Sequence, residues 1–269
     1  MPKPNWFEAC SMQTEAALTS PTMSGQEQPQ GTYLNQDTGL VTFTFGGNDL
    51  QWSSVLWDCT KIQSAIVHNT WFYTSDACNQ DISLIMPERI QSMKANLVTA
   101  YTQMLSEAPN AQVRVLTYPP LFPDRGDSSS GCRIGRFSPV QLVIASDVER
   151  QVVGLEQQAN AAIAEAVQQV QATAPGDSRL QLVDVTQQFG GYQGHTVSCG
   201  DTGRPTPWIN SLRMSTTEAA KIYLDANTGR WSQLHSDLRD FYYASFHPTH
   251  EGQYQMYLAM APTLPAGWH

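Results

Sequence analysis

The sequence is poor in charged residues, and basic residues are the scarcest of them. Among 269 residues, Lys and Arg number 15 against 24 Asp and Glu, which leaves a net charge of -9 at pH 7. A chain without a basic stripe cannot neutralise a phosphate backbone, so nucleic acid is excluded as a partner. Charged residues make up 14% of the chain, against roughly 25% in ordinary soluble domains. Neutral polar residues must therefore cover much of the surface, which suits an exported protein.

Long hydrophobic runs are also missing. No apolar stretch approaches the roughly 18 residues that a membrane-spanning helix needs, so no transmembrane segment is predicted. Residues 1–20 hold no charged segment followed by an apolar one, so the sequence as given predicts no signal peptide. The chain contains neither an internal repeat nor a linker, and we expect residues 1–269 to form a single domain.

The spacings typical of metal sites are absent as well. No CxxC pair occurs, and no histidine has a carboxylate or a cysteine at ligand spacing, so we expect no metal. The wide separation of the five cysteines indicates disulfides between loops in an oxidising compartment. The alternative is five buried free thiols in a cytosolic protein. The cysteines are Cys10, Cys59, Cys78, Cys132 and Cys199.

Strand-like and helix-like stretches alternate along the chain. Three β-branched or aromatic runs, at 40–45, 113–118 and 180–185, predict buried strands. Apolar residues three and four positions apart predict helices over 87–108, 148–170 and 250–261. Strands that alternate with such helices indicate an α/β fold with a central parallel sheet. The loop-rich segments 122–139 and 190–213 follow strands, where open parallel sheets build their ligand sites.

The turn Gly46-Gly47-Asn48-Asp49 stands where the first of these strands ends. Two glycines allow the backbone to turn closely beneath a substrate, while Asn48 supplies an amide donor. A developing oxyanion needs such preorganised donors. Asn and Asp after Gly are also ordinary turn residues, so this tetrapeptide alone does not establish a site.

A histidine stands at the start of the last predicted helix, in Ser245-Phe246-His247-Pro248-Thr249-His250-Glu251-Gly252. His247 is fixed before a proline and after the last strand, where it can reach over the sheet edge as a general base. Together with the glycine turn, it is more informative than either motif alone.

With these motifs and three further segments, the sequence resembles the SGNH (GDSL-type) hydrolases, and within them the secreted lipase and esterase branch. Residues 7–11 (Phe-Glu-Ala-Cys-Ser) resemble the second sequence block of the family, residues 41–49 the third and residues 245–252 the last. The intervening signatures of the branch are matched by Tyr118-Pro119, Leu121-Phe122-Pro123, Cys132, Gly194-His195, Cys199 and Trp208-Ile209.

The resemblance implies a three-layer α/β/α sandwich of flavodoxin-like type and a carboxylic-ester hydrolase of lipid metabolism. Its substrates would be lipid, short-acyl or carbohydrate-linked esters, without a metal or organic cofactor. The protein would be a secreted monomer. Asn48 would be the oxyanion-hole side chain, Gly46 and Gly47 would support that hole, and His247 would be the general base. The implied disulfides are Cys59 to Cys78 and Cys132 to Cys199.

The sequence departs from the family pattern in three places. The block with the first strand and the nucleophilic serine, Gly-Asp-Ser, should precede Phe7, so we expect a chain that is N-terminally truncated relative to the family, without that strand. Met12 replaces the glycine of the second block. Ala244 replaces the acid three residues before His247, and its backbone carbonyl would orient the imidazole instead.

Two interpretations of the missing block remain open. Gly126-Asp127-Ser128 spells the nucleophile motif within a loop, but no strand runs directly into Ser128, which makes it a weak substitute. The protein is then either an ester hydrolase or a catalytically inactive SGNH-like protein that retains a binding pocket.

Overall fold

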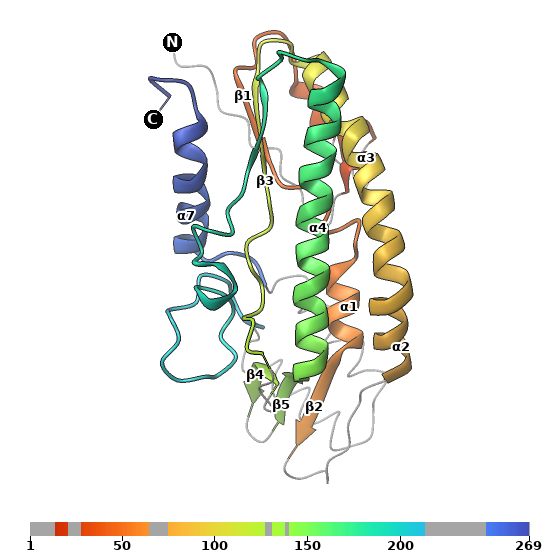
Figure 1. Ribbon diagram of the computed structural model, residues 1–269, viewed down its shortest axis with the longest axis vertical. Coiled ribbons are helices and arrows are strands. Elements are labelled where there is room, and N and C mark those ends of the chain that lie inside the picture. The colour runs from red at the N-terminus through yellow and green to blue at the C-terminus, as the bar shows by residue number, and fades with distance from the viewer. Residues whose placement is uncertain are drawn as a thin grey trace.

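Among the described residues, a parallel sheet of three strands forms the centre of the fold (Figure 1). The strands are β1 (Leu40–Phe43), β3 (Gln112–Leu116) and β6 (Leu180–Val183), in the order β1-β3-β6. Their register pairs Val41 with Val113 and Val115 with Leu182. The computed structural model describes residues 14–20, 28–64, 75–126, 131–137, 140–212 and 246–268. Within this part of the chain β1 forms an edge of the sheet.

Two long helices cover one face of this sheet, and a shorter helix covers the other (Figure 1). The long helices are α3 (Met86–Glu107) and α4 (Ser146–Thr173). Helix α7 (His250–Met260) packs Met256 and Met260 against Val183 on the opposite face. These three layers confirm the predicted α/β/α sandwich. Each of the six predicted strands and helices is present, with its ends shifted by at most a few residues.

The alternation of β3 shows how one strand serves both faces. Val113 and Val115 belong to the core beneath α3 and α4, whereas Leu116 packs with the side chains of α7. Arg114 is almost fully buried, and its Nη2 donates to the Thr263 carbonyl at 2.6 Å while its Nη1 donates to the Arg179 carbonyl at 2.9 Å. This residue therefore ties the turn after α7 to the sheet.

A small antiparallel sheet was not predicted from the sequence. It consists of β2 (Thr60–Ser64), β5 (Val140–Ile144) and β4 (Cys132–Phe137), in the order β2-β5-β4. Strand β4 corrects the interpretation of 122–139 as a loop. Cys132, Arg133 and Ile134 alternate between buried and exposed, but the register shifts between Arg133 and Gly135, so the period-two pattern is too short to indicate a strand.

Short helices complete the described chain. Helix α1 (Trp52–Asp58) precedes β2, and α2 (Ser75–Gln80) continues through the π-helical segment Asp81–Ile85 into α3. Short 3₁₀ turns occupy Glu15–Leu18, Gln30–Tyr33, Gly191–Gln193 and Ala261–Thr263.

Two disulfides staple the loops, as the resemblance implied. Cys59 is bonded to Cys78 across 19 residues of sequence, and Cys132 is bonded to Cys199 across 67. In the chain-entropy model these loops correspond to roughly 3 and 4 kcal/mol of stabilisation, because the longer loop has more freedom to lose.

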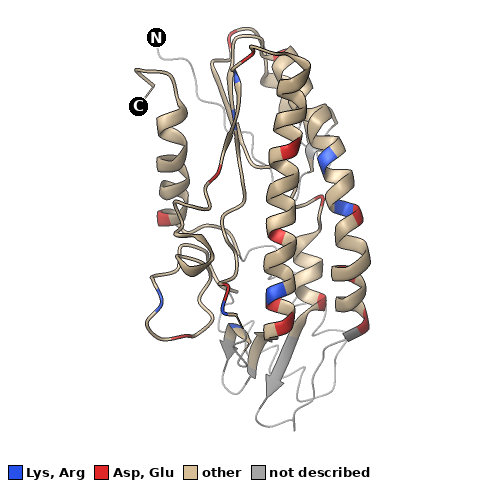
Figure 2. Cartoon of the chain, in the orientation of Figure 1, with Lys and Arg blue, Asp and Glu red and all other residues tan. Residues whose placement is uncertain are grey.

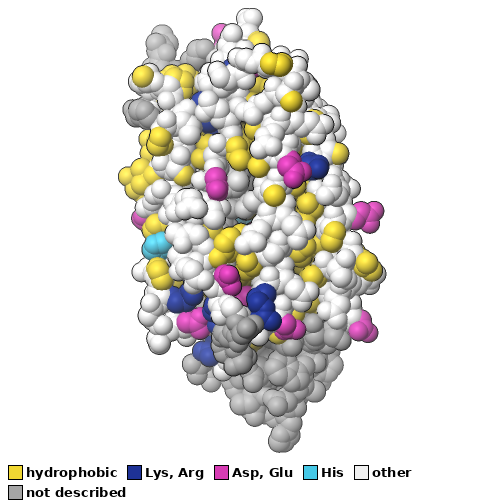
Figure 3. Space-filling view, in the orientation of Figure 1, with side chains coloured by type: hydrophobic (Ala, Val, Ile, Leu, Met, Phe, Trp, Pro, Cys, Tyr) yellow, Lys and Arg dark blue, Asp and Glu magenta, His cyan; other side chains and the backbone are white. Residues whose placement is uncertain are grey.

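The described surface carries few charged side chains. Long stretches of α3 and α4 carry no charged residue (Figure 2), and hydrophobic side chains are scattered among uncharged polar surface (Figure 3). Among the described residues, no helix combines the length and the apolar character needed to cross a bilayer.

Candidate functional site

The candidate site lies at the carboxyl edge of the parallel sheet. Because β1, β3 and β6 run in the same direction, the segments that follow them meet at this edge. The segment after β3 is joined to the segment after β6 by hydrogen bonds from Val197 N to Leu121 O and from Asp124 N to Tyr192 O, both 2.9 Å long. The edge is therefore a connected surface of loops.

The Gly46–Asp49 turn follows β1 at this edge. Leu50 N donates to Gly46 O at 3.0 Å and Gln51 N to Asn48 O at 3.0 Å, which closes the turn ahead of α1. Gly46 has a φ of 116°, and a Cβ there would lie 2.3 Å from the Sδ atom of Met93. Only glycine fits both the conformation and the space. The turn consequently holds Asn48 at the surface.

Gly47 is held by the next strand segment. Its N–H donates to the hydroxyl of Tyr118 at 2.6 Å, two residues beyond the end of β3. Burial raises the pKa of Tyr118 to about 12, and the hydrogen bond from Gly47 partly opposes this. The hydroxyl is therefore neutral and accepts the amide hydrogen. In this arrangement the Gly47 N–H fixes the turn, and Asn48 is the neighbouring side chain that reaches the surface.

Side chains of helix α4 hold the segment at Tyr118 by hydrogen bonds. Asn160 Oδ1 accepts a hydrogen bond from Tyr118 N at 2.8 Å, and its Nδ2 donates to Tyr118 O at 2.9 Å. One turn earlier, Glu156 accepts hydrogen bonds from Leu121 N at 2.9 Å and from the Tyr192 hydroxyl at 3.2 Å. Burial raises the pKa of Glu156 to about 8, and these two hydrogen bonds partly oppose that rise.

His247 reaches the same edge from the chain ahead of α7. The ring of Phe246 packs against Phe122 with centroids 6.1 Å apart, and Phe122 follows β3. His247 O accepts hydrogen bonds from both N and Nδ2 of Asn210, each at 2.9 Å. Phe246 holds the unusual φ of 62°. These contacts fix the backbone on both sides of His247. His247 itself is exposed to solvent.

The residues after His247 fix the start of α7. Pro248 forms an antiparallel bridge with Ile209. Thr249 caps the helix, because its Oγ1 accepts a hydrogen bond from Gly252 N at 3.1 Å. Thr249 N also donates to Trp208 O at 2.7 Å. The position of His247 is therefore set by the 208–210 segment as well as by the helix.

His195 lies beside the 208–210 segment. Its ring stacks on Trp208 with centroids 3.5 Å apart, and its Nδ1 lies 2.7 Å from the Thr206 carbonyl oxygen. A cavity of about 150 Å³ lies in the same loop region, with a polar lining that includes Thr196, Ser198 and Arg204. Part of the predicted loop 190–213, between residues 194 and 207, therefore lines a cavity.

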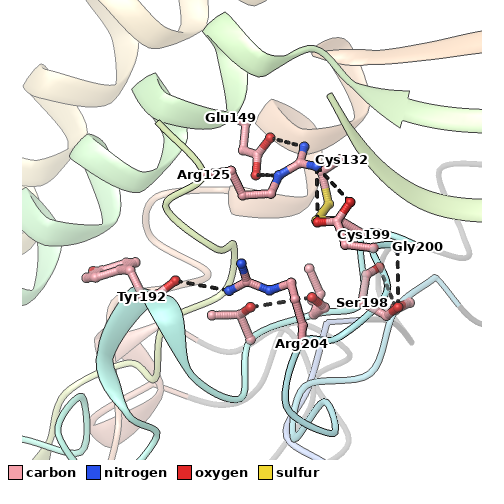
Figure 4. Close-up of a disulfide and its surroundings, with 12 residues drawn as sticks. Arg125, Cys132, Glu149, Tyr192, Ser198, Cys199, Gly200 and Arg204 are labelled. Carbon is pink, nitrogen blue, oxygen red and sulfur yellow. Dashed lines mark hydrogen bonds and ion pairs between the residues drawn. A yellow bond between two sulfur atoms is a disulfide. The ribbon is translucent and has the colours of Figure 1, made fainter. Parts of the chain in front are cut away.

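An ion-pair cluster lies beside the Cys132–Cys199 disulfide (Figure 4). Arg125 Nη2 lies 2.6 Å from Glu149 Oε2, and Arg125 Nη1 lies 3.2 Å from Asp201 Oδ1. Within the described part of the chain, the two disulfide sulfurs and a Glu149 oxygen lie within 4.8 Å of one another, a spacing that could hold a metal ion. Disulfide sulfurs are not thiolates, so this group is not a metal centre.

Comparisons with known proteins point to bacterial lipases. A lipase from Streptomyces rimosus is 26% identical over 211 residues, which are 77% of this chain and 60% of that protein. The crystal structure of the extracellular lipase from Streptomyces rimosus matches with a TM-score of 0.59 and 22% identity, covering 96% of this chain and 79% of that one. A phospholipase A1 from Streptomyces albidoflavus matches with a TM-score of 0.59 and 19% identity, covering 94% and 77%.

The chain has the fold of these lipases. This finding confirms the resemblance to SGNH-type lipases that the motifs indicated. The chain spans about 60% of the length of the curated lipase that it matches. No protein-family model matches the sequence.

Several of the residues named in the sequence analysis lie outside the described part of the chain. They are Cys10, Met12, Ser128 and Ala244. The sequence contains a second Gly-Asp-Ser, at Gly176-Asp177-Ser178. It directly precedes β6, so it lies at the amino edge of the sheet, opposite the Gly46–Asp49 turn. A strand of four residues separates the edges by roughly 13 Å, which keeps Ser178 away from the candidate site.

Two polar residues of α4 that bind the loop after β3 were not predicted from the sequence. Glu156 and Asn160 are four residues apart and lie on the inner side of α4, among Val152, Leu155 and Ala159. Polar residues at helical spacing within an apolar face are the signal that could have found them, because a buried polar group needs a partner.

Proposed function

We propose that the protein hydrolyses carboxylic esters of lipid or short-acyl type. The observation that carries the proposal is the contact of Phe246 with Phe122. It brings the chain beside His247 to the loop that follows β3, and Tyr118 in that loop holds Gly47. A candidate base and a candidate oxyanion turn thus belong to one sheet edge, in a fold shared with Streptomyces lipases.

In the proposed mechanism a serine hydroxyl attacks the ester carbonyl. As the Oγ–C bond forms, the serine proton passes to the imidazole of His247, and Asn48 donates a hydrogen bond to the developing oxyanion. Collapse of the tetrahedral intermediate breaks the C–O bond and returns the proton to the leaving alcohol. Water then attacks the acyl-enzyme by the same route and releases the acid. This reaction requires no metal or organic cofactor.

The setting of the proposed activity is extracellular. The relative of known structure is described as an extracellular lipase. Two disulfides between distant segments also favour an oxidising compartment. The relatives, a lipase and a phospholipase A1, favour lipid esters over carbohydrate-linked esters as substrates.

The test is hydrolysis of p-nitrophenyl acetate and butyrate by the protein and by single variants. Asn48→Ala should lower kcat by about 10² to 10³, the loss typical of one oxyanion donor. His247→Ala should abolish turnover above the uncatalysed rate. His250→Ala is the matched control, because it removes a second exposed histidine three residues away and should retain turnover.

The outcomes separate the two interpretations of the sequence. Turnover that survives His247→Ala would overturn the assignment of the base. Background rates for the unchanged protein, with retained binding of the esters, would instead support an inactive SGNH-like binding protein. Ser128→Ala decides whether the serine of the 126–128 motif is the nucleophile, since loss of turnover with retained folding would require it.

A further inference from the structure

We infer that Tyr118 is a positioning residue of the oxyanion turn, and that Asn160 of α4 holds it in place. The inference rests on the proposed ester hydrolysis and adds the residues through which the fold aims Asn48. Neither residue is the predicted base, the nucleophile or the oxyanion donor. Their contacts form a continuous path from α4 to the Gly46–Asp49 turn.

The first step of this path is the bond between Tyr118 and Gly47. At 2.6 Å from Gly47 N to the tyrosine hydroxyl it is short, and it crosses 71 residues of sequence. A Cβ on Gly47 would lie 2.9 Å from the hydroxyl oxygen, so glycine is needed for this approach. The bond fixes the plane of the Gly46–Gly47 peptide unit, so that only the Gly47 φ and ψ angles separate a fixed peptide plane from the backbone of Asn48. The direction in which the Asn48 side chain leaves the backbone therefore depends on Tyr118.

The second step is the hold of α4 on Tyr118. Asn160 bonds both the N–H and the carbonyl of Tyr118, at 2.8 and 2.9 Å. Two bonds from one side-chain amide fix both the position and the rotation of that residue's backbone. Pro119 and Pro120 follow and restrict the chain further. Tyr118 thereby forms a rigid link between α4 and the Gly46–Asp49 turn.

Glu156 supplies a second anchor on the same helix. It lies four residues before Asn160, on the same side of α4, and accepts the N–H of Leu121. The segment from Tyr118 to Leu121 is thus attached to α4 at both ends. An oxyanion donor must be oriented before the reaction to be effective, and this double attachment provides a rigid support for it.

The chain offers a matched control for the Tyr118 hydroxyl. Tyr101 of α3 is fully buried, and its hydroxyl has no hydrogen-bond partner among the described residues. Tyr101→Phe removes a buried tyrosine hydroxyl without removing a bond to the turn. Tyr118→Phe removes the same atom together with the bond to Gly47.

The first experiment measures hydrogen exchange of the Gly47 amide by NMR. Tyr118→Phe should shift this resonance and speed its exchange at least about tenfold, because the amide loses its acceptor. Tyr101→Phe should leave the exchange rate unchanged. Unchanged protection of Gly47 in Tyr118→Phe, with the fold retained, would overturn the inference. This readout does not depend on turnover.

The second experiment measures kcat and KM for p-nitrophenyl butyrate. Tyr118→Phe should lower kcat about fivefold with KM nearly unchanged, the scale of one hydrogen bond. In an Asn48→Ala background the same change should have almost no effect on kcat, since Tyr118 acts through Asn48. Full and independent effects in the double variant would show a general structural role and would overturn the inference.

Asn160→Ala tests the second step in the same way. It should lower kcat by itself and add little to Tyr118→Phe, and additive losses would contradict the path. Should the unchanged protein lack esterase activity, the proposed function fails and the role in turnover fails with it. The exchange of Gly47 would then still decide whether Tyr118 fixes the turn.

Discussion

Gly252 of α7 lies against the carbonyl oxygen of Trp208, and a Cβ on Gly252 would stand 2.3 Å from that oxygen. The same carbonyl accepts the N–H of Thr249 at 2.7 Å. Because the nearest atom belongs to the backbone, it cannot swing aside as the end of a flexible side chain could. The first turn of α7 therefore packs tightly against the 208–210 segment. This contact helps to set the position of His247.

Gly252→Ala is therefore expected to lower the free energy of unfolding by about 1 to 3 kcal/mol, as overpacking of a tight contact does. The intrinsic preference of helices for Ala, roughly 1 kcal/mol, acts in the opposite direction and is outweighed. Urea denaturation measures the change. Ester hydrolysis should fall as well, since α7 must move away from Trp208 and carry His247 with it.

Gly154→Ala provides the control for this substitution. Gly154 lies within α4, and a Cβ there would meet no heavy atom within 4 Å. The same change should stabilise the protein by about 0.5 to 1 kcal/mol, because only helix propensity acts. A stabilising effect at both positions would refute the account of Gly252.

The pair of Arg125 and Glu149 supports a second prediction. Both side chains are buried, with relative exposures of 7% and 3%. Arg125→Met should lower the free energy of unfolding by about 3 kcal/mol, because it leaves the Glu149 carboxylate buried without its partner. Glu149→Gln should cost less, about 1.5 kcal/mol, since Arg125 keeps its ion pair with Asp201.

The double variant, Arg125→Met with Glu149→Gln, distinguishes a buried charge from lost packing. It should be more stable than Arg125→Met alone, because the neutral amide removes the uncompensated charge. Denaturation with guanidinium chloride measures all three variants. If the double variant is the least stable of them, packing of the Arg125 stem rather than charge accounts for the loss.

The parallel sheet and its long helices could be predicted from the sequence because their signals are local. The run 40–45 and the apolar spacing of 148–170 each depend on neighbouring residues, and β1 and α4 lie where these patterns indicate. Strand β4 could not be predicted, because its pairing with β5 and its disulfide to Cys199 supply order that its own residues do not show.

The candidate site was partly predictable for the same reason. Gly46 and Gly47 mark a tight turn by themselves, and the structure gives each a contact that excludes a side chain. The partners of the turn are far away in the sequence, and no local pattern links Tyr118 to Gly47. The bonds of Asn160 likewise depend on how α4 packs beside β3, which is a tertiary property.

Glu156 supports the last prediction, a stability that falls as the pH rises. Burial raises the pKa of Glu156 from its ordinary value of 4.5 to about 8. Between these values the folded protein keeps a proton that the unfolded chain has released, so unfolding releases a proton and becomes more favourable as the pH rises. The contribution is fully present below pH 4.5 and is lost as the pH passes about 8.

Urea unfolding at pH 5 and pH 8 measures this contribution, which is bounded by about 1.4 kcal/mol per pH unit. Glu156→Gln should reduce the difference between the two pH values, because the neutral amide can still accept the N–H of Leu121 and cannot ionise. Glu165→Gln is the control, since Glu165 is an exposed residue of the same helix with a side-chain exposure of 58%. An equal loss of stability with pH in the unchanged protein and in Glu156→Gln would assign the effect to other groups, and Glu156 would then be only a hydrogen-bond acceptor for the loop after β3.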